Sequence, residues 1–130
     1  MAGNPNDVID WHEAMQQCGE DEEFLRELLA DLRTETQAQV NNITQVIQNP
    51  QDQPYHRIMR AAHVIKGAAA NLMCQQLRMT AMQLEQAASA AHDAGETAAP
   101  SNIQANVQAR FGDLQQAVQS YLQFVQSLGI

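Results

Sequence analysis

Apolar residues recur every three or four positions along almost the whole chain, and no segment alternates with the period of two expected of a half-buried strand. This pattern predicts a short amphipathic helix over about residues 7–17 and a long helix that begins after Asp21. Asp21 is a suitable N-cap, and acidic residues follow it where the helix dipole favours negative charge. The apolar stripe of the long helix, which reaches about residue 48, consists of Phe24, Leu25, Leu28, Leu29, Leu32, Val40, Ile43 and Ile47.

Three further helices are predicted. Residues 49–54 contain two prolines that break the chain, and a third helix then runs from about Tyr55 to residue 72. After a tight connection over about residues 73–75, a fourth helix ends at Gly95, and a last helix spans about residues 101–127. Such spacings are typical of bundle seams. We therefore predict an all-α fold with one domain over residues 1–130. It is an antiparallel four-helix bundle with the 7–17 helix as a lid, which Trp11 pins onto the bundle.

Composition excludes several classes of protein. The chain has 130 residues, with 7 Lys and Arg against 15 Asp and Glu and a formal net charge of −8, which argues against nucleic-acid binding. No apolar run approaches the roughly 20 residues of a membrane span, and the N-terminus lacks the pattern of a signal peptide. Cys18 and Cys74 have neither metal spacing nor a disulfide framework, so we interpret them as reduced thiols of an intracellular protein.

Positive charge is concentrated in one part of this acidic chain. Residues 53–84 contain no Asp or Glu, although they hold four of the seven cations. A positive band on an acidic protein favours a local acidic partner over a polyanion. The band consists of Arg57, Arg60, Lys66 and Arg78.

The sequence lacks the patterns of three kinds of enzymatic site. Carboxylate-bridged metal sites in bundles need Glu three residues before His. A cysteine–histidine hydrolase needs oxyanion donors on loops, of which this chain has few, and a glycine-rich phosphate loop is missing. We therefore predict no metal, no cofactor and no ATP hydrolysis. The residues three positions before the four histidines are Ile9, Gln53, Arg60 and Ser89.

The predicted third helix carries a histidine on its outer side. At about 100° per residue, the apolar positions 58, 62, 65, 69 and 72 cluster around one direction, and His63 lies about 140° from it. Gly67, Ala70 and Cys74 fall on the same outer side, and acidic residues are missing nearby. Lys66, the only lysine of the chain, lies one turn from His63. A mid-helix glycine destabilises by about 0.5–1 kcal/mol relative to alanine, so Gly67 indicates close approach by a partner.

The segment from Ala62 to Leu72, AHVIKGAAANL, resembles the signature of histidine-containing phosphotransfer (HPt) domains, in which His-x-x-Lys-Gly precedes small residues. Asp10-Trp11, the acidic start and leucine stripe of the second helix, and Leu84-Glu85 in the fourth also look like the family. One departure is Met73, where the family usually has glycine. It lies about 60° from the centre of the apolar face, so we expect it to alter helix packing and the fine shape of the docking face.

The resemblance implies a phosphorelay carrier without kinase activity of its own. The phospho-aspartate of a receiver domain would donate to His63, through Nε2 by family likeness, and His63 would pass the group to another receiver. Neutral imidazole, with an ordinary pKa of about 6.5, is a competent nucleophile at cellular pH. Lys66 would offset the charge of the phosphoryl oxygens. Magnesium is expected on the receiver, so the chain itself would need no cofactor.

The implied partners are receiver domains of hybrid histidine kinases and of response regulators. The face of this chain on which they dock should combine apolar contacts with the positive band around His63. We also expect a monomer that works in the cytoplasm, and in the nucleus as well if the source is eukaryotic. The expected docking residues are Met59, Arg60, Gly67 and Ala70, with Arg57 at the periphery.

Two alternatives stay open at this point. The first is a non-catalytic adaptor whose groove binds a partner helix or a receiver domain. It predicts a wide exposed apolar strip and no dependence on His63. The second alternative is that His56, two turns before His63 and about 160° from the apolar face, accepts the phosphoryl group. It lacks the Lys-Gly that follows His63.

Overall fold

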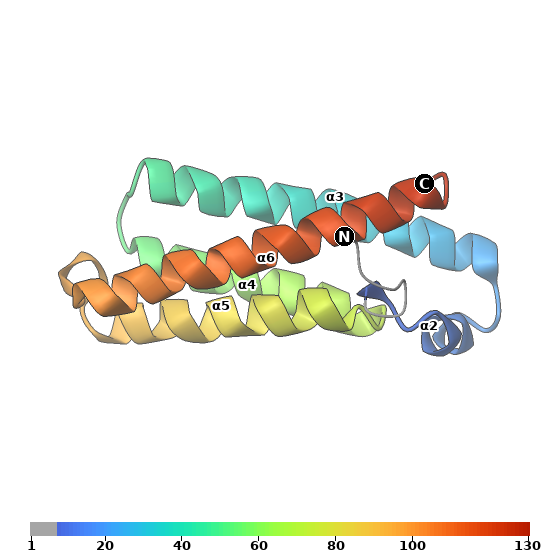
Figure 1. Ribbon diagram of the computed structural model, residues 1–130, viewed down its shortest axis with the longest axis horizontal. Helices are drawn as coiled ribbons and strands as arrows, with labels where there is room; N and C mark the ends of the chain where they lie inside the picture. The colour runs from blue at the N-terminus through green and yellow to red at the C-terminus, as the bar shows by residue number, and fades with distance from the viewer. Residues whose placement is uncertain (1–7) are drawn as a thin grey trace.

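The computed structural model describes residues 8–130 and contains no strand in that range. Helices α3 to α6 run alternately up and down the long axis, and α2 lies beyond the ends of α4 and α5 (Figure 1). Because α3 and α5 each pack against both α4 and α6, the four form the predicted antiparallel bundle. The elements are α2 (Trp11–Gln17), α3 (Glu22–Gln48), α4 (Pro54–Asn71), α5 (Gln75–Asp93), the 3₁₀ helix η1 (Glu96–Ala98) and α6 (Ser101–Ser127).

Aspartates start the first two of these helices. Asp21 caps α3, as predicted, by accepting a hydrogen bond from the backbone N–H of Phe24 at 3.1 Å. Asp10 caps α2 in the same way through the N–H of Glu13, also at 3.1 Å. The N-terminal helix is therefore shorter than predicted, because residues 9 and 10 lie outside any helix and α2 begins at Trp11. The predicted start at residue 7 lies outside the described residues.

The core is formed by the apolar stripes of the four long helices. Leu25, Leu29 and Ile43 of α3 are completely buried, and α4 to α6 contribute their own stripes to the same cluster. Phe24 was predicted in the α3 stripe, but 46% of it is exposed. Successive helix residues point about 100° apart, so Leu25 at the centre of the stripe turns Phe24 outward.

Two contacts attach the start of the N-terminal helix to the bundle. The Trp11 ring packs edge-on against Phe124 of α6, with ring centroids 6.3 Å apart. The backbone N–H of Asp10 donates to the carbonyl of Met73 at 2.9 Å, in the connection between α4 and α5. The predicted pinning role of Trp11 therefore has a structural counterpart at one end of the bundle.

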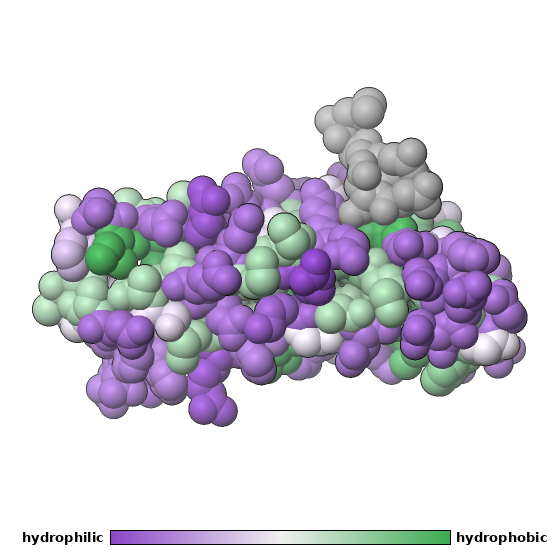
Figure 2. Space-filling view, turned by 90° about the horizontal axis from the view of Figure 1, so that it is seen from below, coloured by the Kyte–Doolittle hydropathy of each residue, from purple (hydrophilic) through white to green (hydrophobic). Residues whose placement is uncertain are grey.

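The surface is mostly polar. From the side of α5, the hydrophobic areas are small and separated by hydrophilic residues (Figure 2). Among the described residues, the large apolar side chains that are exposed are Phe24, Val64 and Met79, which lie on three different helices. None of the described helices is both long enough and apolar enough to cross a membrane.

Candidate functional site

Both ends of α4, the helix that carries His63, are defined by its sequence. Pro54 occupies the first turn, where its fixed φ suits the helix and its missing N–H leaves no donor unpaired. At the other end, Met73 adopts a left-handed conformation with φ 58° and donates its N–H to the carbonyl of Ala70 at 3.2 Å. The N–H of Cys74 donates to the carbonyl of Ala69 at 2.9 Å. This is a Schellman helix end, where glycine is the usual residue.

The geometry of this helix end bears on Met73, the departure from the family pattern, and on the predicted position of Cys74. Met73 replaces the family's glycine at a position where the backbone itself favours glycine, so the change concerns conformation more directly than core packing. Cys74 was predicted on the outer side of the helix, but it is completely buried because the chain has already left the helix at that point. Burial raises the pKa of its thiol to about 12. Both Cys18 and Cys74 are free cysteines.

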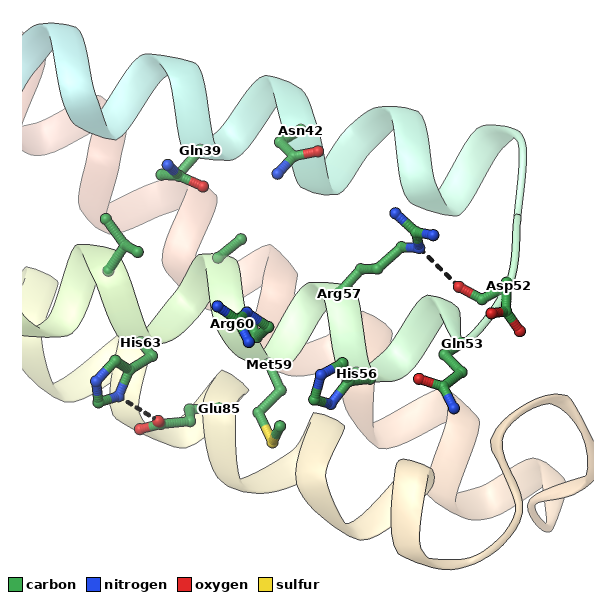
Figure 3. Close-up of a pocket in the computed structure, with 12 residues that line it drawn as sticks. Gln39, Asn42, Asp52, Gln53, His56, Arg57, Met59, Arg60, His63 and Glu85 are labelled. Atoms are coloured by element: carbon green, nitrogen blue, oxygen red, sulfur yellow. Dashed lines mark hydrogen bonds and ion pairs between the residues drawn. The ribbon is translucent and has the colours of Figure 1, made fainter.

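The middle of α4 presents His63 to solvent. Its neighbours Ala62 and Ile65 are completely buried, whereas the His63 side chain is 67% exposed. This exposure agrees with the direction predicted from the helical periodicity. The ring stands on the side of α4 that faces α5, next to Glu85 (Figure 3).

Glu85 of α5 joins two of the predicted site residues. One carboxylate oxygen, Oε2, lies 2.7 Å from Nδ1 of His63, and the other, Oε1, accepts a hydrogen bond from Nζ of Lys66 at 2.6 Å. Acidic residues had been expected to be missing near His63, and this expectation is wrong. The motif in α4 therefore includes a third member that comes from the neighbouring helix.

The charge state of Glu85 determines which nitrogen of the His63 ring carries the hydrogen. Partial burial raises the pKa of this carboxyl, but the hydrogen bonds and charges of Lys66 and His63 outweigh burial and hold the pKa below its ordinary value of 4.5. An ionised carboxylate only accepts hydrogen bonds, so Nδ1 of His63 is the donor. In the neutral ring, Nε2 then carries the lone pair, and it does not point at Glu85 (Figure 3).

Toward its C-terminal end, beyond His63, the outer face of α4 carries small residues. Gly67 is exposed and Ala70 is half-buried. A Cβ added to Gly67 would meet nothing within 4 Å, so no contact within the described molecule requires glycine there. Lys66, with a side chain 30% exposed, lies beside these small residues and still has two ammonium hydrogens beyond the one given to Glu85.

On the other side of His63, a groove of about 830 Å³ lies between α3 and α4. We call it the α3–α4 groove. Figure 3 shows Gln39 and Asn42 of α3 on one wall and Arg57 and Arg60 of α4 below them. The predicted docking residues Met59, Arg60 and Arg57 all line it. The lining residues are Gln39, Asn42, Asp52, Gln53, His56, Arg57, Met59, Arg60, Ala61, His63, Val64 and Glu85.

The comparison with protein families shows to which family the chain belongs. The family model described as Hpt domain matches residues 27–124, which is more than half of the chain and includes His63, Lys66 and Glu85. The chain belongs to the Hpt domain family. Hpt domains carry phosphoryl groups in phosphorelays by exchange with receiver domains, and they are not kinases. No curated protein and no solved structure matches the chain significantly.

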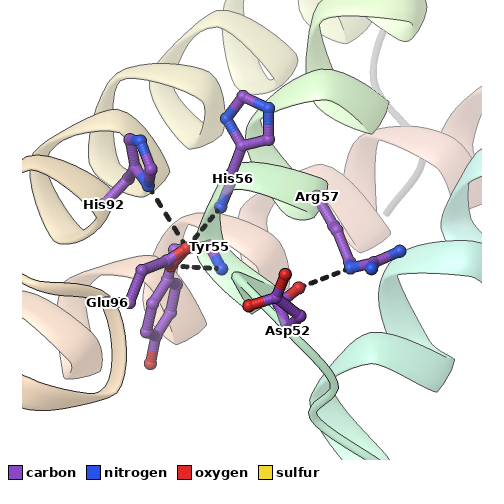
Figure 4. Close-up of polar contacts among 6 residues, drawn as sticks. All are labelled: Asp52, Tyr55, His56, Arg57, His92 and Glu96. Carbon is purple, nitrogen blue, oxygen red and sulfur yellow. Dashed lines mark hydrogen bonds and ion pairs between the residues drawn. The ribbon is translucent and has the colours of Figure 1, made fainter.

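A second histidine–glutamate cluster of this Hpt domain lies at the start of α4 (Figure 4). Glu96, in η1, accepts hydrogen bonds from the backbone N–H groups of Tyr55 and His56 at 2.9 and 3.1 Å. Nδ1 of His92 lies 3.3 Å from the same carboxylate, and the His92 ring is 5.0 Å from that of His56. His56 was predicted on the exposed side, but it is half-buried, and its Nδ1 is buried without a partner among the described residues.

The two predicted sets of site residues are thus distributed over three places. His63 and Lys66 meet at Glu85, the basic docking residues line the groove, and the small residues lie beyond His63. Glu85 was missed as a site residue, although its place in a family-like Leu-Glu pair was the signal that could have found it. Within residues 8–130, no group of three or more His, Cys, Asp or Glu side chains is arranged to hold a metal ion. The need for no cofactor stays a prediction.

Proposed function

We propose that this Hpt domain takes a phosphoryl group from the phospho-aspartate of a receiver domain onto Nε2 of His63 and passes it to the aspartate of a response-regulator receiver. The observation that carries the proposal is the state of the His63 ring. Its side chain is 67% exposed, and its Nδ1 is bound to Glu85 at 2.7 Å. The ring therefore presents one nucleophilic nitrogen, held in a defined orientation, at the surface.

The transfer is balanced without a proton leaving the ring. The lone pair of Nε2 forms a bond to phosphorus, the bond from phosphorus to the aspartate oxygen breaks, and its electrons stay on the aspartate as carboxylate. The ring becomes an N-phosphorylated imidazolium, whose positive charge is stabilised by the Glu85 carboxylate 2.7 Å from Nδ1. Transfer to the next receiver runs through the same steps in reverse. Because the carrier only exchanges the group, it needs no nucleotide site.

Lys66 supports the proposal through its position next to the same carboxylate. Its bond to Glu85 at 2.6 Å holds the ammonium near His63, where it can offset charge on phosphoryl oxygens. The docking surface proposed for the receiver consists of Met59, Arg60, Gly67 and Ala70, with Arg57. Gly67 and Ala70 give clearance on one side of the ring, because small residues there allow another backbone to approach closely.

The remaining elements of the proposal concern the surroundings of the reaction. Magnesium on the receiver would supply electrostatic stabilisation of the transferring group, and we propose that this chain contributes no ligand to it. We place the carrier in the cytoplasm, and in the nucleus as well if the source is eukaryotic, with receivers of hybrid kinases and response regulators as partners. We propose that it acts as a monomer.

Incubation with a phosphorylated receiver domain tests the function. The wild-type chain should become labelled, and the label should be lost in acid, because a phosphoramidate is acid-labile whereas phosphoserine and phosphothreonine are not. His63→Gln should remain unlabelled. A label that survives acid, or one that persists in His63→Gln, would contradict the proposal.

The adaptor alternative makes a different prediction in the same assay. An adaptor would bind the receiver equally well as the wild type or as the His63→Gln variant, and neither form would take up label. The wide apolar strip that an adaptor needs is not visible on the face shown in Figure 2. The exposed His63 next to Glu85 and Lys66 favours the carrier.

A further inference from the structure

The α3–α4 groove is larger than phosphoryl transfer at His63 requires. The ring and its Glu85 partner lie at one end of the groove, which continues along α4 past Arg60 and Arg57 to Asp52 at the connection between α3 and α4 (Figure 3). Its volume of about 830 Å³ is in the range of pockets that hold a ligand or a peptide segment. A partner that reaches His63 therefore has a defined depression beside it on the α3 side.

The groove gathers positive charge that the molecule does not neutralise. Among residues 8–130 there are four ion pairs, and none includes Arg57 or Arg60. Nε of Arg57 donates to the backbone carbonyl of Asp52 at 2.6 Å, which orients the side chain and leaves its terminal nitrogens for a partner. Of the two lining carboxylates, that of Glu85 is already bound by His63 and Lys66, and that of Asp52 forms no ion pair with either arginine.

The three cations outside the positive band are held by contacts away from the groove. Arg33 of α3 donates to the carbonyl of Ile130 at 2.7 Å, and Arg26 donates to the carbonyl of Leu128, so both are used to hold the end of α6. Arg110 pairs with Asp113 at 3.4 Å. The guanidinium groups of the groove are thus placed where an external anion can use them.

The wall opposite the arginines carries two neutral amides. Asn42 is exposed and Gln39 is half-exposed, and both lie across the groove from α4 (Figure 3). Nε2 of Gln39 donates to Glu35 within α3 at 3.5 Å, which leaves the amide of Asn42 as the donor of this wall. Amide groups can donate to a carboxylate or to a peptide carbonyl. Exposed Val64 and half-buried Met59 add apolar contact area at the end nearest His63. The two sides of His63 therefore differ, because the α3 side offers two guanidinium groups outside any ion pair of the described residues, whereas the cation on the α5 side, Lys66, is paired with Glu85.

We propose that an acidic segment of the receiver domain lies in the α3–α4 groove while the receiver exchanges its phosphoryl group with His63. This inference rests on the proposed function and adds α3 to the docking surface through Gln39 and Asn42. The groove orients the receiver, because the segment enters on the α3 side and the phosphorylated aspartate lies above His63. Gly67 and Ala70 then face the part of the receiver that extends beyond the histidine.

A carboxylate placed in the groove tests this orientation. Asn42→Asp adds one negative charge to the wall, whereas Asn41→Asp adds the same charge to the neighbouring residue of α3, which does not line the groove. Transfer rates should be measured against the concentration of a phosphorylated receiver, at low and high salt. We expect Asn42→Asp to raise the half-saturating concentration by roughly fivefold or more at low salt and by less at high salt. Asn41→Asp should stay near the wild type.

A second pair of variants removes positive charge. Arg57→Gln should weaken receiver docking. Arg78→Gln is the control and should leave docking near the wild type, because it removes a cation of α5 that is hydrogen-bonded to Gln75 and lies outside the groove. With phosphoramidate, a small donor that needs no docking, Asn42→Asp and Arg57→Gln should both accept phosphate at the wild-type rate. That result would place the defect in docking.

The outcomes separate this inference from the proposed function. Equal effects of Asn42→Asp and Asn41→Asp would overturn the groove assignment, because net charge alone would then explain the loss. An equal loss with phosphoramidate would overturn it as well, because the histidine site itself would be disturbed. Labelling that no longer depends on His63 would remove the proposed function. Labelling that needs His63 but ignores the groove variants would remove the groove alone.

Discussion

The Hpt domain has two histidine–glutamate clusters along one helix, and they differ in what the carboxylate binds. At the middle of α4, Glu85 binds two side chains, His63 and Lys66, at 2.7 and 2.6 Å. At the start of α4, Glu96 binds two backbone N–H groups, those of Tyr55 and His56, at 2.9 and 3.1 Å. Glu85 therefore binds side chains only, whereas Glu96 binds the backbone more closely than it binds a side chain, with Nδ1 of His92 at 3.3 Å.

The consequence of this difference lies in exposure. Glu96 occupies the N-terminus of α4, where the first N–H groups have no partner within the helix and the dipole favours a negative charge. Its histidine neighbours are packed against each other, with ring centroids 5.0 Å apart. Glu85 instead orients a ring that is 67% exposed. A histidine near a glutamate is therefore informative about chemistry only when the carboxylate engages the ring of an exposed histidine.

The largest expected effect separates the two histidines. His63→Gln should abolish phosphate acceptance from a receiver, a loss of about a thousandfold or more, because no other nucleophile occupies the site. Its melting temperature should stay within about 2 °C of the wild type, since exposed substitutions change stability little. His56→Gln should accept phosphate at a near-normal rate. An inactive His56→Gln with an intact fold would exchange the roles assigned to the two clusters.

Substitutions of the two glutamates should also differ in their effect on transfer, and those of Glu85 should slow it. Glu85→Ala removes the acceptor of Nδ1, so transfer should fall roughly tenfold to a hundredfold, since a hydrogen bond to a charged group is worth about 1.5–3 kcal/mol. Glu85→Gln keeps a carbonyl acceptor for Nδ1 and should recover part of the rate. Single-turnover transfer measures both. Equal rates for Ala and Gln would show that orientation of the ring is not the role of this residue.

Acid should disrupt the Glu85 cluster in a defined direction. The pKa of Glu85 is lowered in the fold, so its contribution to stability is present above the ordinary value of 4.5 and is lost as the pH falls through the folded pKa. Glu85→Gln should therefore lose less stability than the wild type as the pH falls below the ordinary value of 4.5. Thermal unfolding at several pH values measures this difference.

The next effect concerns stability alone. Glu96→Ala removes two hydrogen bonds at the start of α4 and should lower the free energy of unfolding by about 1–2 kcal/mol. This corresponds to a melting temperature lower by about 3–8 °C. At a temperature where the variant is folded, transfer through His63 should be close to the wild-type rate. A stable Glu96→Ala that transfers slowly would link the cap to the chemistry and weaken the comparison.

The sequence predicted the helices well because the signals that define them are local. Asp21 as a cap, Pro54 at a first turn and Gly95 after α5 act within a few residues of where they stand. The exposure of His63 followed from the same kind of local information, because the apolar positions of one helix fix the direction of its core. Phe24 shows the limit, since two adjacent apolar residues at a helix start do not reveal which of them faces inward.

The partner of His63 could not be predicted in the same way. Which residue of α5 lies beside His63 depends on the register between α4 and α5, and the Schellman turn at Met73 sets that register. The helical wheel continued α4 through this turn, and for that reason it placed buried Cys74 outside. Glu85 is 22 residues from His63 in the sequence, and only the antiparallel packing of the two helices brings their side chains together.

The smallest effect compares Gly67 inside α4 with Met73 just after its end, and neither residue binds either carboxylate. At Met73, with φ 58°, alanine keeps the left-handed strain and glycine removes it, so Met73→Gly should be more stable than Met73→Ala by about 1 kcal/mol. At Gly67 the order should reverse, because the residue lies inside the helix and a Cβ there meets nothing within 4 Å. Gly67→Ala should then stabilise the fold by about 0.5–1 kcal/mol.

Transfer measurements decide why residue 67 is a glycine. Gly67→Gln should keep the melting temperature near that of the wild type, because glutamine is a good helix former. Its side chain would nevertheless occupy the exposed surface one turn from His63, where the proposed receiver approaches. Transfer from a phosphorylated receiver should fall steeply, and acceptance from phosphoramidate should change far less. If both donors react with Gly67→Gln as with the wild type, glycine at this position serves neither the fold nor docking, and the face of small residues beyond His63 has no part in the carrier's function.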